Sequence, residues 1–129
     1  MTSIAVAFQS ERGHTKSLAD SVVKGMAGVE GVTAKQYQIL GKDVSQGRLA
    51  NPGLMSELDR CDGIVFGCAT YMGSGSAVFK SFLEAAFRPH WFEQRWKDKI
   101  AAALQTPRRK AEISSRRCCS WRSLPCKWE

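Results

Sequence analysis

Several features of common protein classes are missing from this 129-residue sequence. No apolar run approaches the roughly 18 residues needed to span a bilayer, and the first residues lack the basic segment and long apolar core of a secretory leader. The five cysteines form no CxxC pair and no Cys/His spacing typical of zinc sites, so neither a disulfide scaffold nor a metal site is expected. The absences predict a cytoplasmic protein, and the length fits one domain.

An excess of acidic residues is also missing, and the formal net charge is +7. Residues 1–104 contain 12 Lys and Arg against 10 Asp and Glu, a net of +2, whereas residues 105–129 contain 7 against 2, a net of +5. The last segment also holds three of the five cysteines and two of the four tryptophans. We therefore divide the chain into a domain, residues 1–104, and a basic tail, residues 105–129. The basic character says little about the partners of the domain.

Short apolar runs without polar alternation indicate buried strands, because a strand that is apolar on both faces is covered on both faces in a parallel sheet. Periodicity, caps and breakers predict strands at 4–8, 33–39, 63–67 and 100–104, and helices at 15–26, 54–61 and 77–87. Strands that alternate with helices favour an open parallel sheet in a three-layer α/β fold. Ligands of such sheets bind beyond the carboxyl ends of the strands, where the strand order reverses.

The turn from Ser10 to Thr15 lies at such an end, between the first strand and the first helix. It offers two hydroxyl groups, the flexible Gly13 and the free N–H groups of a helix start, with Thr15 as the expected cap. The Gly-Lys-Ser/Thr ending of a triphosphate loop and the GxGxxG pattern are both absent, so we expect a terminal phosphate monoester here. The alternative is an ordinary polar turn, in which His14 is solvated and does not donate to phosphate.

Residues 68–76 are expected to form a second loop at the same end of the sheet, after the strand at 63–67. Its residues Thr70, Tyr71, Met72 and Gly73 are small, hydroxylated or planar enough to lie against a flat ligand. The alternative for Tyr71 and Met72 is packing beneath the loop. Cys68 does not match a phosphatase nucleophile, because Ser74 stands where the Cys-x5-Arg pattern needs arginine.

At these two loops the chain resembles the flavodoxin-like superfamily, and in particular the NAD(P)H-dependent FMN oxidoreductases of the Trp-repressor-binding-protein type, which are quinone reductases. The resemblance covers about residues 3–104 and is fairly specific, because several motifs recur in order. They are the SERGHT segment at 10–15, IVFGCATYMG at 64–73, SAVFKSFL at 76–83 and WKDKI at 96–100.

The resemblance implies a flavodoxin-like α/β/α fold that binds FMN, with NADH or NADPH as co-substrate and a quinone or similar small molecule as acceptor. No side chain would act as nucleophile or base, because the flavin carries the hydride. The family also suggests a homo-oligomer, a tetramer or a dimer, and gives no membrane partner. By the same resemblance the cofactor-binding residues are Ser10, Glu11, Arg12, Gly13, His14, Thr15, Thr70, Tyr71, Met72 and Gly73, and Arg12 and Trp91 lie near nicotinamide and quinone.

The family pattern breaks after Leu104, where a flavin loop, a helix, a fifth strand and a final helix are expected. The tail instead shows no apolar period. Our interpretation is a frameshift: codons can be chosen so that the shifted frame gives a flavin-loop-like segment, then Gly-Asp-Lys and an amphipathic helix. The product would lack the fifth strand and the last helices, would expose its fourth strand as an edge, and would bind FMN weakly. Gene sequencing tests this hypothesis.

Two other functions remain open. A flavodoxin-type electron carrier would need no substrate site, although carriers usually present an acidic docking face, which a net of +2 does not support. The chain is otherwise a non-functional truncated product or a basic-tailed binding module. In that module Arg108, Arg109, Arg116 and Arg117, with Trp121 and Trp128, would contact nucleic acid, but no recognised nucleic-acid module is present.

Overall fold

The computed structural model describes residues 1–106. The expectations for Arg108, Arg109, Arg116, Arg117, Trp121, Trp128 and the shifted-frame segment lie outside this range. Among the described residues, no helix is long and apolar enough to cross a bilayer. The elements are β1 (Thr2–Phe8), α1 (His14–Ala27), β2 (Val32–Gln38), β3 (Val44–Ser45), β4 (Arg48–Leu49), α2 (Pro52–Arg60), β5 (Gly63–Tyr71), β6 (Ser74–Gly75), α3 (Ala77–Ala86) and β7 (Ile100–Thr106), with a 3-10 turn at Gly41–Asp43 and a kinked segment at Phe87–Trp91 in which Arg88 is extended.

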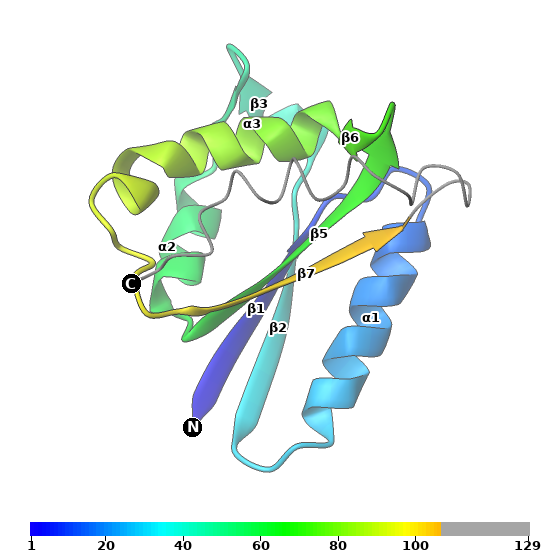
Figure 1. Ribbon diagram of the computed structural model, residues 1–129, viewed down its shortest axis with the longest axis vertical. Helices are drawn as coiled ribbons and strands as arrows, with labels where there is room; N and C mark the ends of the chain where they lie inside the picture. The colour runs from blue at the N-terminus through cyan, green and yellow to red at the C-terminus, as the bar shows by residue number, and fades with distance from the viewer. Residues whose placement is uncertain (107–129) are drawn as a thin grey trace.

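Four strands form the parallel sheet that the sequence predicts. Their order is β2-β1-β5-β7, and β6 folds back antiparallel on the end of β5. From β1 the chain moves outward to β2, then crosses to the other side of β1 to form β5 and β7 (Figure 1). The strand order therefore reverses between β1 and β5. The carboxyl ends of these two strands are the expected position of a ligand.

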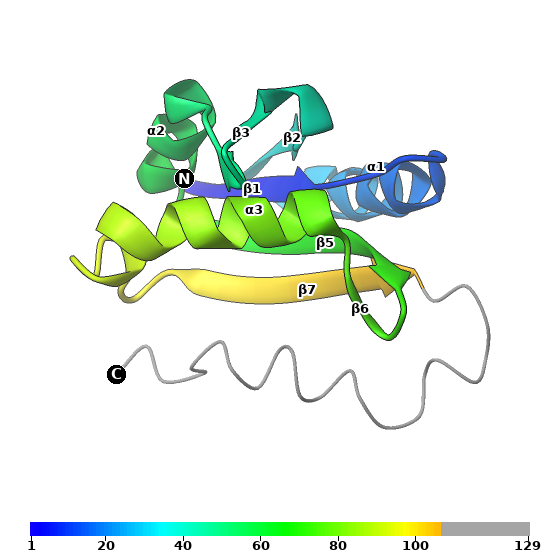
Figure 2. The same ribbon diagram turned by 90° about the horizontal axis from the view of Figure 1, so that it is seen from above.

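The helices cover the two faces of the sheet, as the three-layer prediction requires. Helix α1 packs on one face with Val6, Phe8, Val65 and Leu104, and α2 and α3 pack on the other (Figures 1 and 2). Among the described helices α1 alone covers its face. Strand β7 pairs with β5 and with no other described strand, and its Ile100 is 63% exposed.

Gly67 explains why a glycine interrupts the apolar run of β5. A Cβ atom built there would lie 2.7 Å from Leu104 Cδ1 and 2.9 Å from Phe8 Cβ. The position is closed on both sides by the neighbouring strands, so only glycine lets Phe8 and Leu104 both stand beneath α1.

Two expectations about local structure are wrong. Residues 68–71 are not loop but the last residues of β5, because the ladder to β7 continues through Cys68 and Ala69, and the turn is confined to Met72 and Gly73. Thr15 is not the cap of α1: the N-cap is Gly13, whose φ of 88° needs glycine, and Thr15 is buried in the first turn.

On the face of the sheet that α2 and α3 cover, a polar cluster joins α2 to the segment after α3. The carboxylate of Asp59 accepts hydrogen bonds from Trp96 Nε1 at 2.7 Å and from His90 Nδ1 at 2.8 Å, and the two rings stack with centroids 4.9 Å apart. The His90 residue is buried. Lys99 Nζ donates to the carbonyl oxygen of Asp59 at 2.8 Å, which satisfies the end of α2.

Asp59→Ala should lower the free energy of unfolding by about 2–4 kcal/mol, because it leaves the buried N–H groups of His90 and Trp96 without an acceptor. Urea titration followed by tryptophan fluorescence measures the loss. Asp59→Asn is the control, since its one remaining carbonyl oxygen should recover part of the stability. Equal midpoints for Asp59→Ala and the unchanged chain would contradict this role.

Candidate functional site

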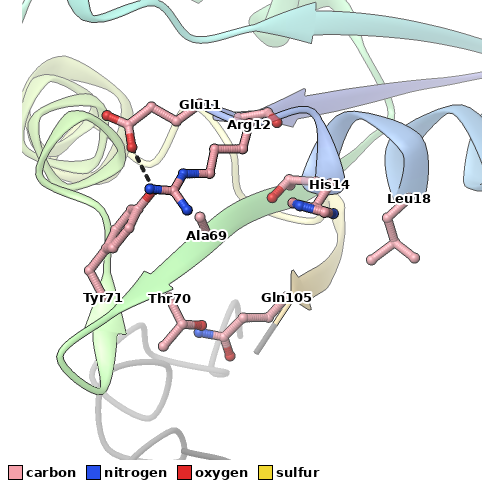
Figure 3. A pocket seen from close by; sticks show the side chains of 10 residues that line it. Glu11, Arg12, His14, Leu18, Ala69, Thr70, Tyr71 and Gln105 are labelled. Carbon is pink, nitrogen blue, oxygen red and sulfur yellow. Dashed lines mark hydrogen bonds between the residues drawn. The ribbon is translucent and has the colours of Figure 1, made fainter. Parts of the chain in front are cut away.

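A cavity of about 530 Å³ opens at the carboxyl edge of the sheet, where the strand order reverses (Figure 3). This volume lies within the usual range for small-molecule sites, roughly 300–1,000 Å³. Three segments distant in sequence meet here: the turn from β1 to α1, the end of β5 and the end of β7. The lining residues are Ser10, Glu11, Arg12, His14, Thr15, Leu18, Ala69, Thr70, Tyr71 and Gln105.

The turn from β1 to α1 forms one side of the cavity, at the N-terminus of α1. Ser10 Oγ accepts a hydrogen bond from the Gly13 N–H at 3.0 Å, which closes the turn. Among residues 1–106, no side chain caps the N-terminus of α1. His14 and Thr15 of its first turn line the cavity together with Arg12, so the positive end of the helix dipole lies beside it. This arrangement suits a phosphate monoester at the surface of the molecule.

The buried hydroxyl group of Thr70 indicates that the cavity binds a polar ligand. Its side chain is only 3% exposed, and within the described part of the chain its Oγ1 has no hydrogen-bond partner. A buried polar atom without a partner costs free energy, and Thr70 lines the cavity. A ligand hydroxyl or carbonyl group would satisfy this atom.

A hydrogen bond spans the cavity between its two main sides. Tyr71 Oη donates to Glu11 Oε2 at 2.6 Å, across 60 positions of sequence (Figure 3). The aromatic ring of Tyr71 is thereby held against the cavity, where it can face a planar ligand.

The structure brings most of the predicted site residues to the cavity. The exceptions are Gly13, Met72, Gly73 and Trp91, of which Gly13 is the N-cap of α1. Met72 is 99% exposed at the hairpin turn, with a φ of 51°, and it does not line the cavity. Gly73, with a φ of 75°, completes that turn. Trp91 stacks on Phe87, with ring centroids 5.1 Å apart, and lies after the C-terminal end of α3. Because α3 has ten residues, its C-terminal end is about 15 Å from the end next to the hairpin. Its role near a substrate stays a prediction.

Sequence reasoning missed three lining residues. Leu18 follows His14 by one helical turn and so shares its side of α1. Ala69 and Gln105 line the cavity because β5 and β7 run further than the apolar pattern predicts, with Cys68 opposite Gln105 in the ladder. The sequence contains no local signal for either residue, because only the ladder between β5 and β7 shows that the strands continue.

The donor set fits FMN. The uncapped helix start with Arg12 and His14 suits its phosphate, the unpartnered Thr70 hydroxyl suits a polar group of its chain or ring, and Tyr71 suits its planar ring. Among the described residues, no group of three or more His, Cys, Asp or Glu side chains could hold a metal ion.

Comparison with known proteins identifies a family and several relatives. The family model for NADPH-dependent FMN reductase matches residues 6–115. Flavodoxin FldP of Pseudomonas aeruginosa (strain UCBPP-PA14) is 35% identical over 100 residues, which cover 78% of this chain and 48% of that protein. Quinone-oxidoreductase QR2 of Triphysaria versicolor is 31% identical over 93 residues, with 65% and 45% covered. The chain spans about half the length of the curated relatives it matches.

Solved structures agree with the fold. A flavodoxin, WrbA-like protein from Agrobacterium tumefaciens superposes with a TM-score of 0.70 and 30% identity, over 87% of this chain and 64% of that one. The apo form of an NADH:FMN oxidoreductase, EMOB, gives a TM-score of 0.69 at 21% identity, over 88% and 62%. The second likeness shows the fold alone. The flavodoxin-like α/β fold expected from the sequence is confirmed.

Cys68 should resist alkylation at neutral pH, although it lies next to the site. The side chain is 1% exposed, and burial raises the pKa of its thiol to about 11, against a smaller lowering by a hydrogen bond from the Ser76 backbone. The reactive thiolate therefore forms only as the pH approaches 11. Iodoacetamide labelling at pH 7.5, mapped by mass spectrometry, should leave Cys68 unmodified until urea unfolds the chain. Rapid labelling of Cys68 in the folded protein would contradict its burial.

Proposed function

Because the chain belongs to the NADPH-dependent FMN reductase family, we propose that it is an FMN-dependent oxidoreductase that passes electrons from NAD(P)H to a quinone or similar small acceptor. FMN agrees with the family and with the donor set of the cavity. Bound FMN supplies the hydride chemistry, and the protein supplies binding, orientation and local charge. The observation that carries the proposal is the buried, unpartnered Thr70 hydroxyl beside an uncapped helix start, in one cavity at the strand reversal.

Each side of the cavity has a separate task in this proposal. The turn from Ser10 to Thr15 holds the phosphate, and the Arg12 guanidinium adds the positive charge that a phosphate or a nicotinamide dinucleotide requires. Thr70 fixes the orientation of the flavin through its free hydroxyl, and Tyr71 covers the ring. The acceptor is then a planar molecule that approaches the uncovered part of the ring, with Trp91 retained from the sequence as a proposed contact.

A flavodoxin-type electron carrier is the second candidate, and the likeness to flavodoxin FldP favours it. A carrier and a reductase share the FMN cavity but differ in what reaches it. The carrier exchanges single electrons with protein partners, whereas the reductase must admit a dinucleotide and an acceptor.

Thr70→Val should weaken FMN binding about five- to tenfold and leave the apoprotein as stable as before or slightly more stable. Valine has nearly the same shape, so it removes a buried hydroxyl that has no partner among residues 1–106 and would gain one in the complex. Quenching of FMN fluorescence measures affinity, and urea titration measures stability. Ser76→Ala is the matched control: its hydroxyl accepts from the Phe79 N–H, so stability should fall. Equal affinity of Thr70→Val and the unchanged chain would remove Thr70 from the site.

Turnover separates the two candidates. With FMN bound, the oxidoreductase should oxidise NADPH or NADH at a rate that depends on added quinone, followed at 340 nm. Arg12→Ala should lower kcat/KM for the dinucleotide about tenfold or more, since one charge-assisted contact is lost. If the chain binds flavin that chemical reductants can reduce, but does not oxidise NAD(P)H, the electron-carrier function is supported and the reductase function is contradicted.

A further inference from the structure

Glu11 is an unusual residue for a turn that binds an anion. It adds a negative charge between Ser10 and Arg12, in a segment whose other features attract phosphate. A carboxylate directed at the same N–H groups would compete with the ligand. Instead, the Glu11 side chain extends to Tyr71 on the other side of the cavity (Figure 3). The role of the Glu11 side chain is therefore to bind Tyr71 and not to contact the phosphate.

Tyr71 is fixed at its backbone but needs an anchor at its far end. It is the last residue of β5 and pairs with Ser74 of β6, across the tight turn of Met72 and Gly73. The residue is only half-buried, so the orientation of its ring depends on side-chain contacts as well as on backbone pairing. The 2.6 Å hydrogen bond from Tyr71 Oη to the Glu11 carboxylate is short, as expected when the acceptor is charged.

We propose that Glu11 is a positioning residue, which holds the Tyr71 ring in place as a wall of the flavin cavity. The inference rests on the proposed function, because the ring is expected to face the flavin. A ring fixed before binding lowers the entropy cost of ordering the site. The same contact turns the Glu11 charge toward Tyr71 and away from the start of α1.

The contact itself can be tested without any ligand. The whole sequence has two tyrosines, Tyr37 and Tyr71, so the full chain labelled with 3-fluorotyrosine should give two fluorine NMR signals, which Tyr37→Phe assigns. Glu11→Ala should shift and sharpen the Tyr71 signal, because the hydroxyl loses its bond to the carboxylate. Glu11→Gln should leave it near its original position, since the amide oxygen still accepts. The Tyr37 signal is the internal control, because its hydroxyl is bonded to Glu57.

Riboflavin is the probe for the Tyr71 wall, because it has the ring of FMN but no phosphate. With FMN, removal of the Glu11 charge could strengthen phosphate binding and mask a weaker contact with the ring. We expect Glu11→Ala and Tyr71→Phe each to weaken riboflavin binding about five- to tenfold, and the double variant to be no weaker than either single variant, because both remove the same bond. Glu11→Gln should bind like the unchanged chain. Binding is followed by quenching of riboflavin fluorescence.

The outcomes separate this inference from the proposed function. If the unchanged chain binds neither riboflavin nor FMN, the assignment of flavin as the ligand is overturned. The role of Tyr71 as a wall of a flavin cavity is then overturned too, even if the fluorine signals show that the hydrogen bond between Tyr71 and Glu11 is present. If flavin binds and Glu11→Ala changes neither the Tyr71 signal nor the affinity, the positioning role alone is overturned. Additive losses in the double variant would also overturn it, because Glu11 and Tyr71 would then act separately. Circular dichroism melts confirm that each variant is folded.

Discussion

The pairing of β1 with β5 is the constraint on which the rest of the structure depends. These strands are central, and the chain leaves β1 in one direction and returns to β5 from the other. Their register sets Phe8 opposite Gly67, and Leu104 lies on the other side of that glycine. A side chain at position 67 would separate the strands or displace α1. The site inherits its geometry from this ladder, because both of its main sides begin where the two strands end.

The central strands and the three helices could be predicted from sequence because each has a strong local signal. The apolar runs of β1, β5 and β7 have no polar alternation, and the helices show regular apolar spacing between clear breakers. The position of the turn from Ser10 to Thr15 at the carboxyl end of the sheet could also be predicted, since it follows a buried strand and precedes a helix. These features depend on residues within about ten positions of one another.

The features that sequence missed depend on contacts between distant segments. β5 continues to Tyr71 through residues that resemble a loop, because β7 supplies hydrogen-bond partners beside it. Asp59, His90 and Trp96 form their cluster across more than 30 positions. Glu11 looked like one more residue of the phosphate turn, and only the position of Tyr71 reveals a different partner. Periodicity and spacing contain no information about such pairs, so the sequence located the cavity but not the arrangement inside it.

The sides of the cavity are not held equally. The turn after β1 and the end of β5 belong to central strands that are paired on both sides, whereas Gln105 belongs to β7, which has β5 as its one partner among the described strands. Strands at an edge open more readily than central strands, because fewer hydrogen bonds and contacts must be broken. Any ligand that contacts Gln105 together with Thr70 therefore joins the edge strand to the centre of the sheet. Ligand affinity and the docking of β7 are then linked. A ligand that contacts both strands stabilises the docked β7, and a change that leaves β7 undocked in some molecules lowers the apparent affinity by the docked fraction.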